Sequence, residues 1–129
     1  MASSLAKVAR ERAQTIVDRL PEVERTDNPI GCYFLVRRKI FGQVLTVLDA
    51  QSEPVTMVVG RPDPMEREAL LAIGHPYFSR GAMDDRVGRI AIVIDAHTDW
   101  DEVAELFTES YRITAPKKLV SRLDSQGSA

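Results

Sequence analysis

Two runs of basic side chains are the residues of this sequence best suited to chemistry, and that chemistry is the binding of phosphate. Arg37, Arg38 and Lys39 follow one another between two apolar segments. Residues 112–122 hold four more cations and no acid. Cations that share one surface release counterions from nucleic acid when they contact its phosphates, which supplies most sequence-insensitive affinity. The candidate nucleic-acid-binding residues are Arg37, Arg38, Lys39, Lys117, Lys118 and Arg122.

Asp95, His97 and Asp99 alternate along the chain in a pattern that could bind a metal ion. Oxygen and nitrogen donors spaced two apart can face one ion if the segment is extended. Asp99, however, falls in the first turn of an expected helix, where the helix dipole alone favours an acid. We therefore expect no metal and no cofactor, and keep a metal or small molecule near Asp95 and His97 as an alternative.

Catalytic machinery is not evident in the sequence. His75 and His97 could exchange protons near neutral pH, but neither lies in a nucleophile motif such as Gly-x-Ser-x-Gly. Cys32 is the single cysteine, which excludes an internal disulfide or a cysteine-based zinc site, and its place at the start of a strand is typical of a buried thiol. We expect no enzymatic activity and assign no catalytic residue.

Length and composition describe an ordinary globular chain. Its 129 residues, 44% hydrophobic and 28% charged, predict a single domain over residues 1–123 and a flexible tail over 124–129. The net charge of −2 gives it no overall basic field, so any basic surface must be local. Lys7, Arg10 and Arg12 interrupt the stretch where a signal peptide would be apolar, and no segment reaches membrane-spanning length. We expect a cytoplasmic protein with no membrane partner.

The first expected element is a helix over residues 5–20. Its apolar residues recur at steps of three and four and predict one buried stripe: Leu5, Val8, Ala9, Ala13, Ile16, Val17 and Leu20. Pro21 should end this helix. The residues from Pro21 to Gly31 are rich in proline, aspartate and asparagine, which predicts a connecting loop.

Three strands are expected next. Residues 32–36 and 40–48 are rich in β-branched and aromatic residues, and the polar break between them predicts a β-hairpin with a basic tip. A two-residue turn needs positive φ, which arginine tolerates poorly, and this argues for a wider turn. Residues 55–59 form the third apolar run, between Pro54 and Gly60.

Helix-start signals converge at Asp63, where an N-cap acceptor is followed by a proline and then, three residues on, by a glutamate. This helix should end at Gly74, a natural C-cap. Its predicted inward residues are Met65, Ala69, Leu70 and Ile73. Residues 77–83 are expected to form a short strand or an irregular edge.

The alternation of Ile90, Ile92 and Ile94 predicts a central strand. Thr98 is expected to cap a helix, and Ala115-Pro116 to open a last short one. The predicted buried residues of these two helices are Trp100, Val103, Ala104, Phe107, Tyr111, Leu119, Val120 and Leu123. Because the strands are grouped between helices, the sequence predicts an α+β fold with an antiparallel sheet.

Several segments resemble one family of small bacterial proteins. They are Leu20-Pro21-Glu22-Val23-Glu24, the hairpin over residues 36–41, residues 98–106 (TDWDEVAEL), Ser110-Tyr111-Arg112 and Ala115-Pro116-Lys117-Lys118-Leu119. They resemble the MmcQ/YjbR family, most strongly over residues 70–123. The resemblance implies a compact fold similar to secretion chaperones, in the order α-β-β-β-α-β-β-α. The family is often labelled DNA-binding, so the resemblance also implies DNA as a partner.

The chain departs from many members of that family at two places. It has Arg37-Arg38 where they have a glycine in the first hairpin turn. It has Arg86-Val87-Gly88-Arg89 where they have a tryptophan before the strand around Ile90. Both departures add positive charge, and no role of that tryptophan carries over.

Two classes of function follow from these observations. The favoured one is weak, sequence-insensitive DNA binding, although the acids over residues 99–109 would keep phosphate away from their own helix. The alternative is a protein- or peptide-interaction module, or a homodimer, that uses an open sheet face or edge. DNA binding should weaken steeply as salt rises, whereas binding through apolar area should tolerate salt.

Overall fold

The computed structural model describes residues 2–127, and within them the side chains of residues 4–126. Helices and one antiparallel sheet make up this part of the chain, which confirms the predicted α+β class. The helices are α1 (Ala2–Val17), α2 (Pro64–Ile73), α3 (Ala82–Val87), α4 (Trp100–Thr114) and α5 (Lys117–Gly127). The strands are β1 (Val23–Asn28), β2 (Gly31–Val36), β3 (Lys39–Leu48), β4 (Pro54–Gly60), β5 (Tyr77–Phe78) and β6 (Ile90–Val93), in the spatial order β1-β2-β3-β4-β6-β5.

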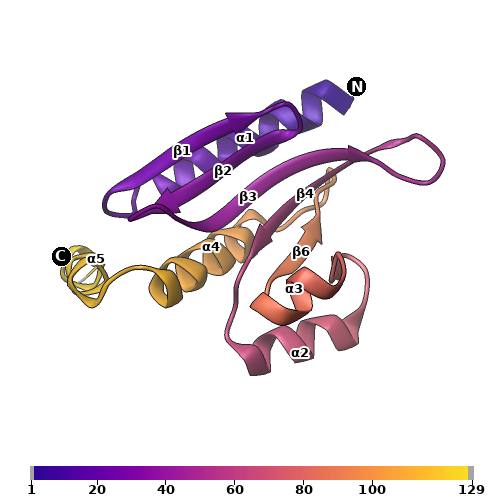
Figure 1. Ribbon diagram of the computed structural model, residues 1–129. Coiled ribbons are helices and arrows are strands. Elements are labelled where there is room, and N and C mark those ends of the chain that lie inside the picture. The colour runs from indigo at the N-terminus through magenta and orange to yellow at the C-terminus, as the bar shows by residue number, and fades with distance from the viewer. Residues whose placement is uncertain (1, 128–129) are drawn as a thin grey trace.

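The core lies between the sheet and the helices α1 and α4, which pack side by side against one face (Figure 1). Phe34 and Phe107 meet edge to face with ring centroids 6.0 Å apart, and Phe41 and Tyr111 do the same at 5.4 Å. The buried Tyr111 hydroxyl donates a hydrogen bond to the carbonyl of Pro21 at 2.7 Å. These contacts fix α4, and with it the end of the sheet where β3 begins.

Two strand glycines determine how closely α4 approaches the sheet. A Cβ at Gly42 would lie 3.0 Å from Phe107 Cε1, and one at Gly60 would lie 2.8 Å from Leu106 Cγ. Because both distances are shorter than ordinary van der Waals contact, only glycine lets the helix pack at its present depth.

The loop predicted over residues 21–31 is wrong, because most of it is strand β1. β1 pairs antiparallel with β2, from Val23 opposite Val36 to Asn28 opposite Gly31. An edge strand that is exposed on both faces needs no alternation of apolar residues, and charged side chains are typical of such edges. The preceding helix ends at Val17, before the predicted stop at Pro21, and Val8 of its predicted stripe is exposed.

The turn between β2 and β3 is tight, so the wider turn we expected is wrong. Val36 pairs with Lys39, and the two residues between them have positive φ, 49° at Arg37 and 68° at Arg38. Two-residue turns of this kind match the twist of the strands but favour Asn-Gly. Each arginine in this conformation costs about 1–2 kcal/mol. The two arginines at the hairpin tip therefore lower the stability of the fold.

Helix α2 begins where predicted but presents the opposite face. Asp63 caps it by accepting the N–H of Met65 at 2.9 Å, and Gly74 ends it with φ 84°. Met65, Ala69 and Ile73, predicted to face inward, are exposed to solvent. The predicted inward face was therefore wrong for all but Leu70.

The cap of α4 is Asp99 and not Thr98. Asp99 accepts the N–H of Asp101 at 3.0 Å, whereas the Thr98 hydroxyl accepts the N–H of Asp95 one turn earlier at 2.8 Å. Val103, Phe107 and Tyr111 are buried as predicted.

The segment between α2 and β6 contains β5 and also α3, a short helix that the sequence did not indicate. Asp84 of α3 is buried and accepts hydrogen bonds from Arg80 N, Nε and Nη2. Residues 124–127, expected in the tail, continue α5, and residues 128–129 lie outside the described part of the chain. No helix in residues 2–127 is long and apolar enough to cross a membrane.

Candidate nucleic-acid interface

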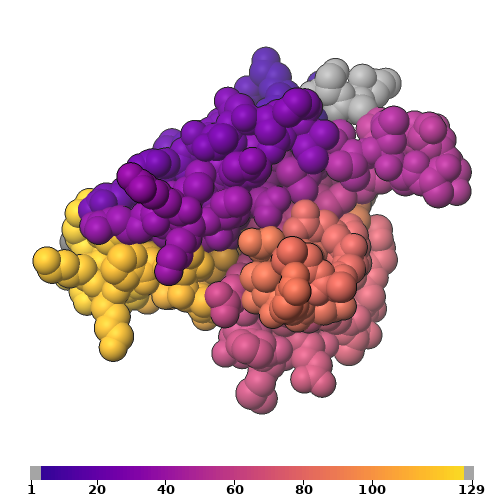
Figure 2. Space-filling view, viewed as in Figure 1, coloured from indigo at the N-terminus to yellow at the C-terminus, as the bar shows by residue number. Residues whose placement is uncertain are grey.

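A cleft opens at the end of the sheet because the β2–β3 hairpin projects beyond β4. The last β3–β4 pair is Gly42 opposite Gly60, whereas Lys39 and Ile40 pair only with β2. The hairpin forms one wall, the ends of β4 and β6 form the other, and the C-terminal end of α4 lies between them. The resulting cleft has a volume of about 350 Å³. Figure 2 shows the surface hollowed where the purple hairpin, the yellow helices and the pink and orange segments meet.

Four cations line this cleft, and no carboxylate does. They are Arg38, Lys39, Arg61 and Arg89. None of them forms an ion pair with any residue that the structure describes, whereas six other arginine–carboxylate contacts hold charges elsewhere. In a chain whose net charge is −2, the cleft is thus a local concentration of positive charge, although the buried Asp84, whose pKa is lowered despite burial mainly by hydrogen bonds from Arg80, also feels the charge of Arg89. Such a surface attracts polyanions.

Arg61 and Arg89 were not among the candidates taken from the sequence. Each stands alone in the chain, but Gly60 pairs with Ile90, so the two arginines flank one rung of the sheet. The pairing of β4 with β6 skips the intervening α2, β5 and α3. The sequence signals are the arginine that follows β4 and the Arg86-Val87-Gly88-Arg89 segment before β6, which adds positive charge.

Ser110 of α4 joins the two walls of the cleft. Its buried hydroxyl accepts the backbone N–H of Arg61 at 2.9 Å and donates to the carbonyl of Phe41. The first bond holds the end of β4, and the second holds the projecting part of β3. A single buried hydroxyl thus sets the separation between Arg61 and the hairpin.

Two of the predicted residues meet at one carboxylate. Arg37 Nε lies 3.1 Å from Glu22 Oε1, and Arg122 Nη1 lies 3.5 Å from Glu22 Oε2. The hairpin tip and α5, far apart in the sequence, therefore lie at the same end of the molecule (Figure 1). Glu22 contacts both arginines, and its single negative charge offsets one of their two positive charges.

The remaining predicted residues lie on α5 or in the cleft. Arg38 and Lys39 line the cleft. Lys117 and Lys118 are exposed in the first turn of α5, where neither forms an ion pair with a described residue. Of the six candidates, Arg38 and Lys39 therefore lie in the cleft, Arg37 and Arg122 contact Glu22, and Lys117 and Lys118 lie on α5.

A second hollow adjoins the cleft on the side of α2 and α3 and shares Arg61 and Val87 with it. Asp63, Asp85 and Glu109 line this hollow together with Arg61, Arg67 and Arg86, so its formal charges cancel. It therefore attracts a polyanion less than the cleft does.

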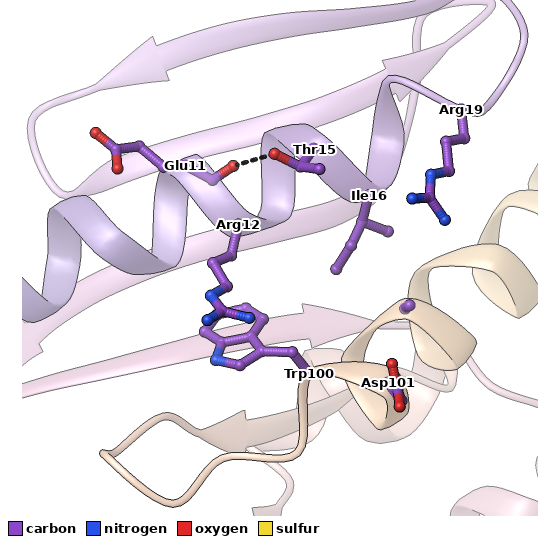
Figure 3. A pocket seen from close by; sticks show the side chains of 8 residues that line it. Glu11, Arg12, Thr15, Ile16, Arg19, Trp100 and Asp101 are labelled. Atoms are coloured by element: carbon purple, nitrogen blue, oxygen red, sulfur yellow. Dashed lines mark hydrogen bonds between the residues drawn. The ribbon is translucent and has the colours of Figure 1, made fainter.

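A larger pocket of about 420 Å³ lies between α1 and α4 (Figure 3). The guanidinium of Arg12 lies over the ring of Trp100, 5.6 Å from its centroid. Arg12 and Arg19 line this pocket together with Glu11 and Asp101, so its formal charges cancel. It is therefore a weaker candidate for an anion than the cleft.

The alternating Asp95, His97 and Asp99 line one hollow together with His75 and Glu102, but their side chains are not arranged as metal ligands. Asp95 Oδ1 accepts the N–H of His97 at 2.7 Å, and Asp99 is occupied as a helix cap. Within the described residues, no group of three or more His, Cys, Asp or Glu side chains could hold a metal ion. Cys32 is buried, and burial raises the pKa of its thiol, as a structural thiol requires.

Tyr77 and Glu102 form the tightest polar contact beside this segment. The Tyr77 hydroxyl donates to Glu102 Oε1 at 2.5 Å, and this hydrogen bond, helped by burial, raises the pKa of Tyr77 to about 12. Tyr77 is therefore a neutral donor at physiological pH.

Comparisons with known proteins agree with this architecture. A solved protein from Pseudomonas syringae is 13% identical, with 84% of this chain and 97% of that one covered and a TM-score of 0.65. The Deinococcus radiodurans protein DR2400, a DUF419 domain, is 17% identical, with 87% and 85% covered and a TM-score of 0.61. At these identities the likeness concerns the fold alone. No functionally curated protein matches the chain. The model of the YjbR family, however, matches residues 18–113, which span the sheet, its hairpin and α4, so this chain belongs to the YjbR family.

Proposed function

We propose that this protein is a non-enzymatic, cytoplasmic DNA-binding protein that contacts the phosphate backbone weakly and without regard to sequence. The observation that carries the proposal is the cleft lined by four cations and no carboxylate. Arginine and lysine are the side chains that contact phosphate most often, and such contacts position a protein without reading bases.

The lining of the cleft also accounts for the lack of sequence preference. Its aromatic residue, Phe41, is buried in the core and offers no face on which a base could stack. Binding of single strands usually adds such stacking to the charge. We therefore expect duplex DNA to bind at least as well as a single strand of the same length.

The experiment is a fluorescence anisotropy titration of labelled duplexes over a range of salt. Four phosphate contacts give a slope of log K against log salt of about −3.6, or about a 150-fold loss of affinity between about 50 and 200 mM. Two duplexes of unrelated sequence should give the same curve. No binding at the lowest salt, or binding that does not change with salt, contradicts the proposal and favours a protein partner.

Two triple variants with matched charge localise the contact. Arg38, Lys39 and Arg61 are changed to glutamine in the first variant. In the second, called the α1 variant, the changed residues are Lys7 and Arg12 of α1 and Arg19 just after it; all six side chains are exposed. The cleft variant should lower affinity by at least about tenfold and reduce the slope to about −0.9, while the α1 variant keeps the wild-type slope. Equal losses in both would mean that only the net charge matters.

A further inference from the structure

Helix α2 carries an apolar stripe that faces solvent. Met65 is 81% exposed and Ile73 is 66% exposed, and Ala69 and Ala72 between them are exposed as well. At about 100° per residue these four positions fall on one side of the helix. Exposed apolar side chains are ordinary when they are scattered, but a continuous row of them marks an interaction surface.

The outward orientation of this stripe is fixed by polar contacts on the other side of the helix. Arg67 Nε donates to the carbonyl of Arg89 at 2.7 Å, and Arg67 Nη2 lies 2.9 Å from Asp85 Oδ1. Leu70 and Leu71 pack beside Arg67 against the core. Turning the helix to bury Met65 and Ile73 would break these contacts, so the stripe is held toward solvent.

Acidic residues flank the stripe on both sides. On the helix surface Glu66 lies beside Ala69 (i, i+3) on one margin of the stripe, and Glu68 lies on the opposite margin beside Ala72 (i, i+4). Both glutamates are exposed, whereas Arg67, the one basic residue of α2, is turned inward. The surface therefore combines an apolar centre with a rim of a single charge.

We propose that this face of α2 binds a basic amphipathic helix of a partner protein. Such a helix lays apolar residues along the stripe, in the i, i+4 spacing of helix-in-groove recognition, and its lysines or arginines meet Glu66 and Glu68. A second copy of α2 would instead bring glutamate against glutamate, and an anionic membrane would be repelled by the same carboxylates. The exposed methionine suits a surface that adapts its shape to a partner.

The test uses a helical model peptide made only of leucine and lysine in amphipathic order, with a control peptide in which glutamate replaces every lysine. Amide shifts of the labelled protein are followed during titration with each peptide. The lysine peptide should saturate and shift the amides of α2, and the glutamate peptide should not. Equal binding of both peptides, or shifts centred on the acidic surface of α4, would overturn the proposal.

Variants at exposed positions separate this surface from the rest of the molecule. Met65→Ser with Ile73→Ser should weaken the lysine peptide at least about tenfold. Val8→Ser with Leu48→Ser, which removes two exposed apolar side chains elsewhere, should leave it unchanged. Glu66→Lys with Glu68→Lys should exchange the preference between the two peptides. Self-association of the free protein that the Met65 and Ile73 changes abolish would assign the stripe to a second copy and contradict the proposal.

Discussion

Ser110 accepts the backbone N–H of Arg61 at 2.9 Å although 49 residues separate them in the sequence. The same hydroxyl donates to the carbonyl of Phe41, so α4 holds both walls of the cationic cleft. Through these two bonds Ser110 positions Arg61 relative to Arg38 and Lys39.

Replacing Ser110 with alanine should therefore affect stability and DNA binding separately. Two buried hydrogen bonds are lost, which should lower the free energy of unfolding by about 1–3 kcal/mol. Because Arg61 is no longer fixed, the salt slope of DNA binding should fall by about 0.9, one phosphate contact. Val103→Ala, a core change in the same helix, should destabilise by about 2 kcal/mol and leave the slope unchanged. If the salt slope of DNA binding were the same in both variants, Ser110 would contribute only to stability and would not position Arg61 for binding.

Replacing the strained arginines at the hairpin tip should raise the stability of the fold and weaken DNA binding. Changing Arg37 to Asn and Arg38 to Gly gives the turn the residues that positive φ favours, so urea unfolding should show a gain of about 1–3 kcal/mol. DNA affinity should fall because Arg38 lines the cleft. Arg38→Gln should lose affinity without that gain. An Asn-Gly turn no more stable than Arg38→Gln would show that the arginines are not strained.

Glu22 occupies two cations that a phosphate could otherwise contact. Glu22→Gln should release Arg37 and Arg122, extend the basic surface from the cleft to α5, and steepen the salt slope by up to about 1.8. Glu24→Gln on β1 makes the same change of charge two residues away, at an exposed glutamate. It should give at most a small increase in affinity with an unchanged slope. If the two variants behave alike, Arg37 and Arg122 take no part in binding.

The Tyr77–Glu102 contact predicts a change of stability at alkaline pH. The folded protein binds the phenolic proton more tightly than the unfolded chain, since the pKa of Tyr77 is raised from 10.0 to about 12. The contribution of this contact is therefore complete below pH 10 and is lost as pH rises toward 12. The unfolding free energy of the wild type should fall more than that of Tyr77→Phe over this window. The chain has three tyrosines, so the pKa of Tyr77 is taken from the difference in tyrosinate absorbance between the wild type and Tyr77→Phe, and a value near 10 would contradict the hydrogen bond.

The elements that the sequence predicted correctly are those determined by residues close to one another in the chain. The hairpin, the start of α2 at Asp63 and the buried face of α4 depend on residues within a few positions of one another. β1 gave no such signal because its side chains are mostly exposed and its stability comes from pairing with β2. The orientation of α2 depends on Arg67, whose side chain contacts Asp85 and the carbonyl of Arg89. Both partners are far from Arg67 in the sequence, so the spacing of apolar residues within α2 could not predict these contacts.

The cleft could be predicted only in part for a similar reason. Arg38 and Lys39 belong to a visible basic run, whereas Arg61 and Arg89 become neighbours only through the pairing of β4 with β6. The sequence also could not indicate that one glutamate, Glu22, would pair with members of both basic runs. Charge runs give the number of cations, but the topology decides which of them are left without a carboxylate.

The two glycines beneath α4 set the width of the cleft without contributing any charge to it. An added methyl group at Gly60 would meet Leu106 Cγ at 2.8 Å and force the helix outward, and Ser110 would move with it. The separation of the cationic groups would then change while every charge stayed in place, and a comparison of charged positions alone would not reveal it.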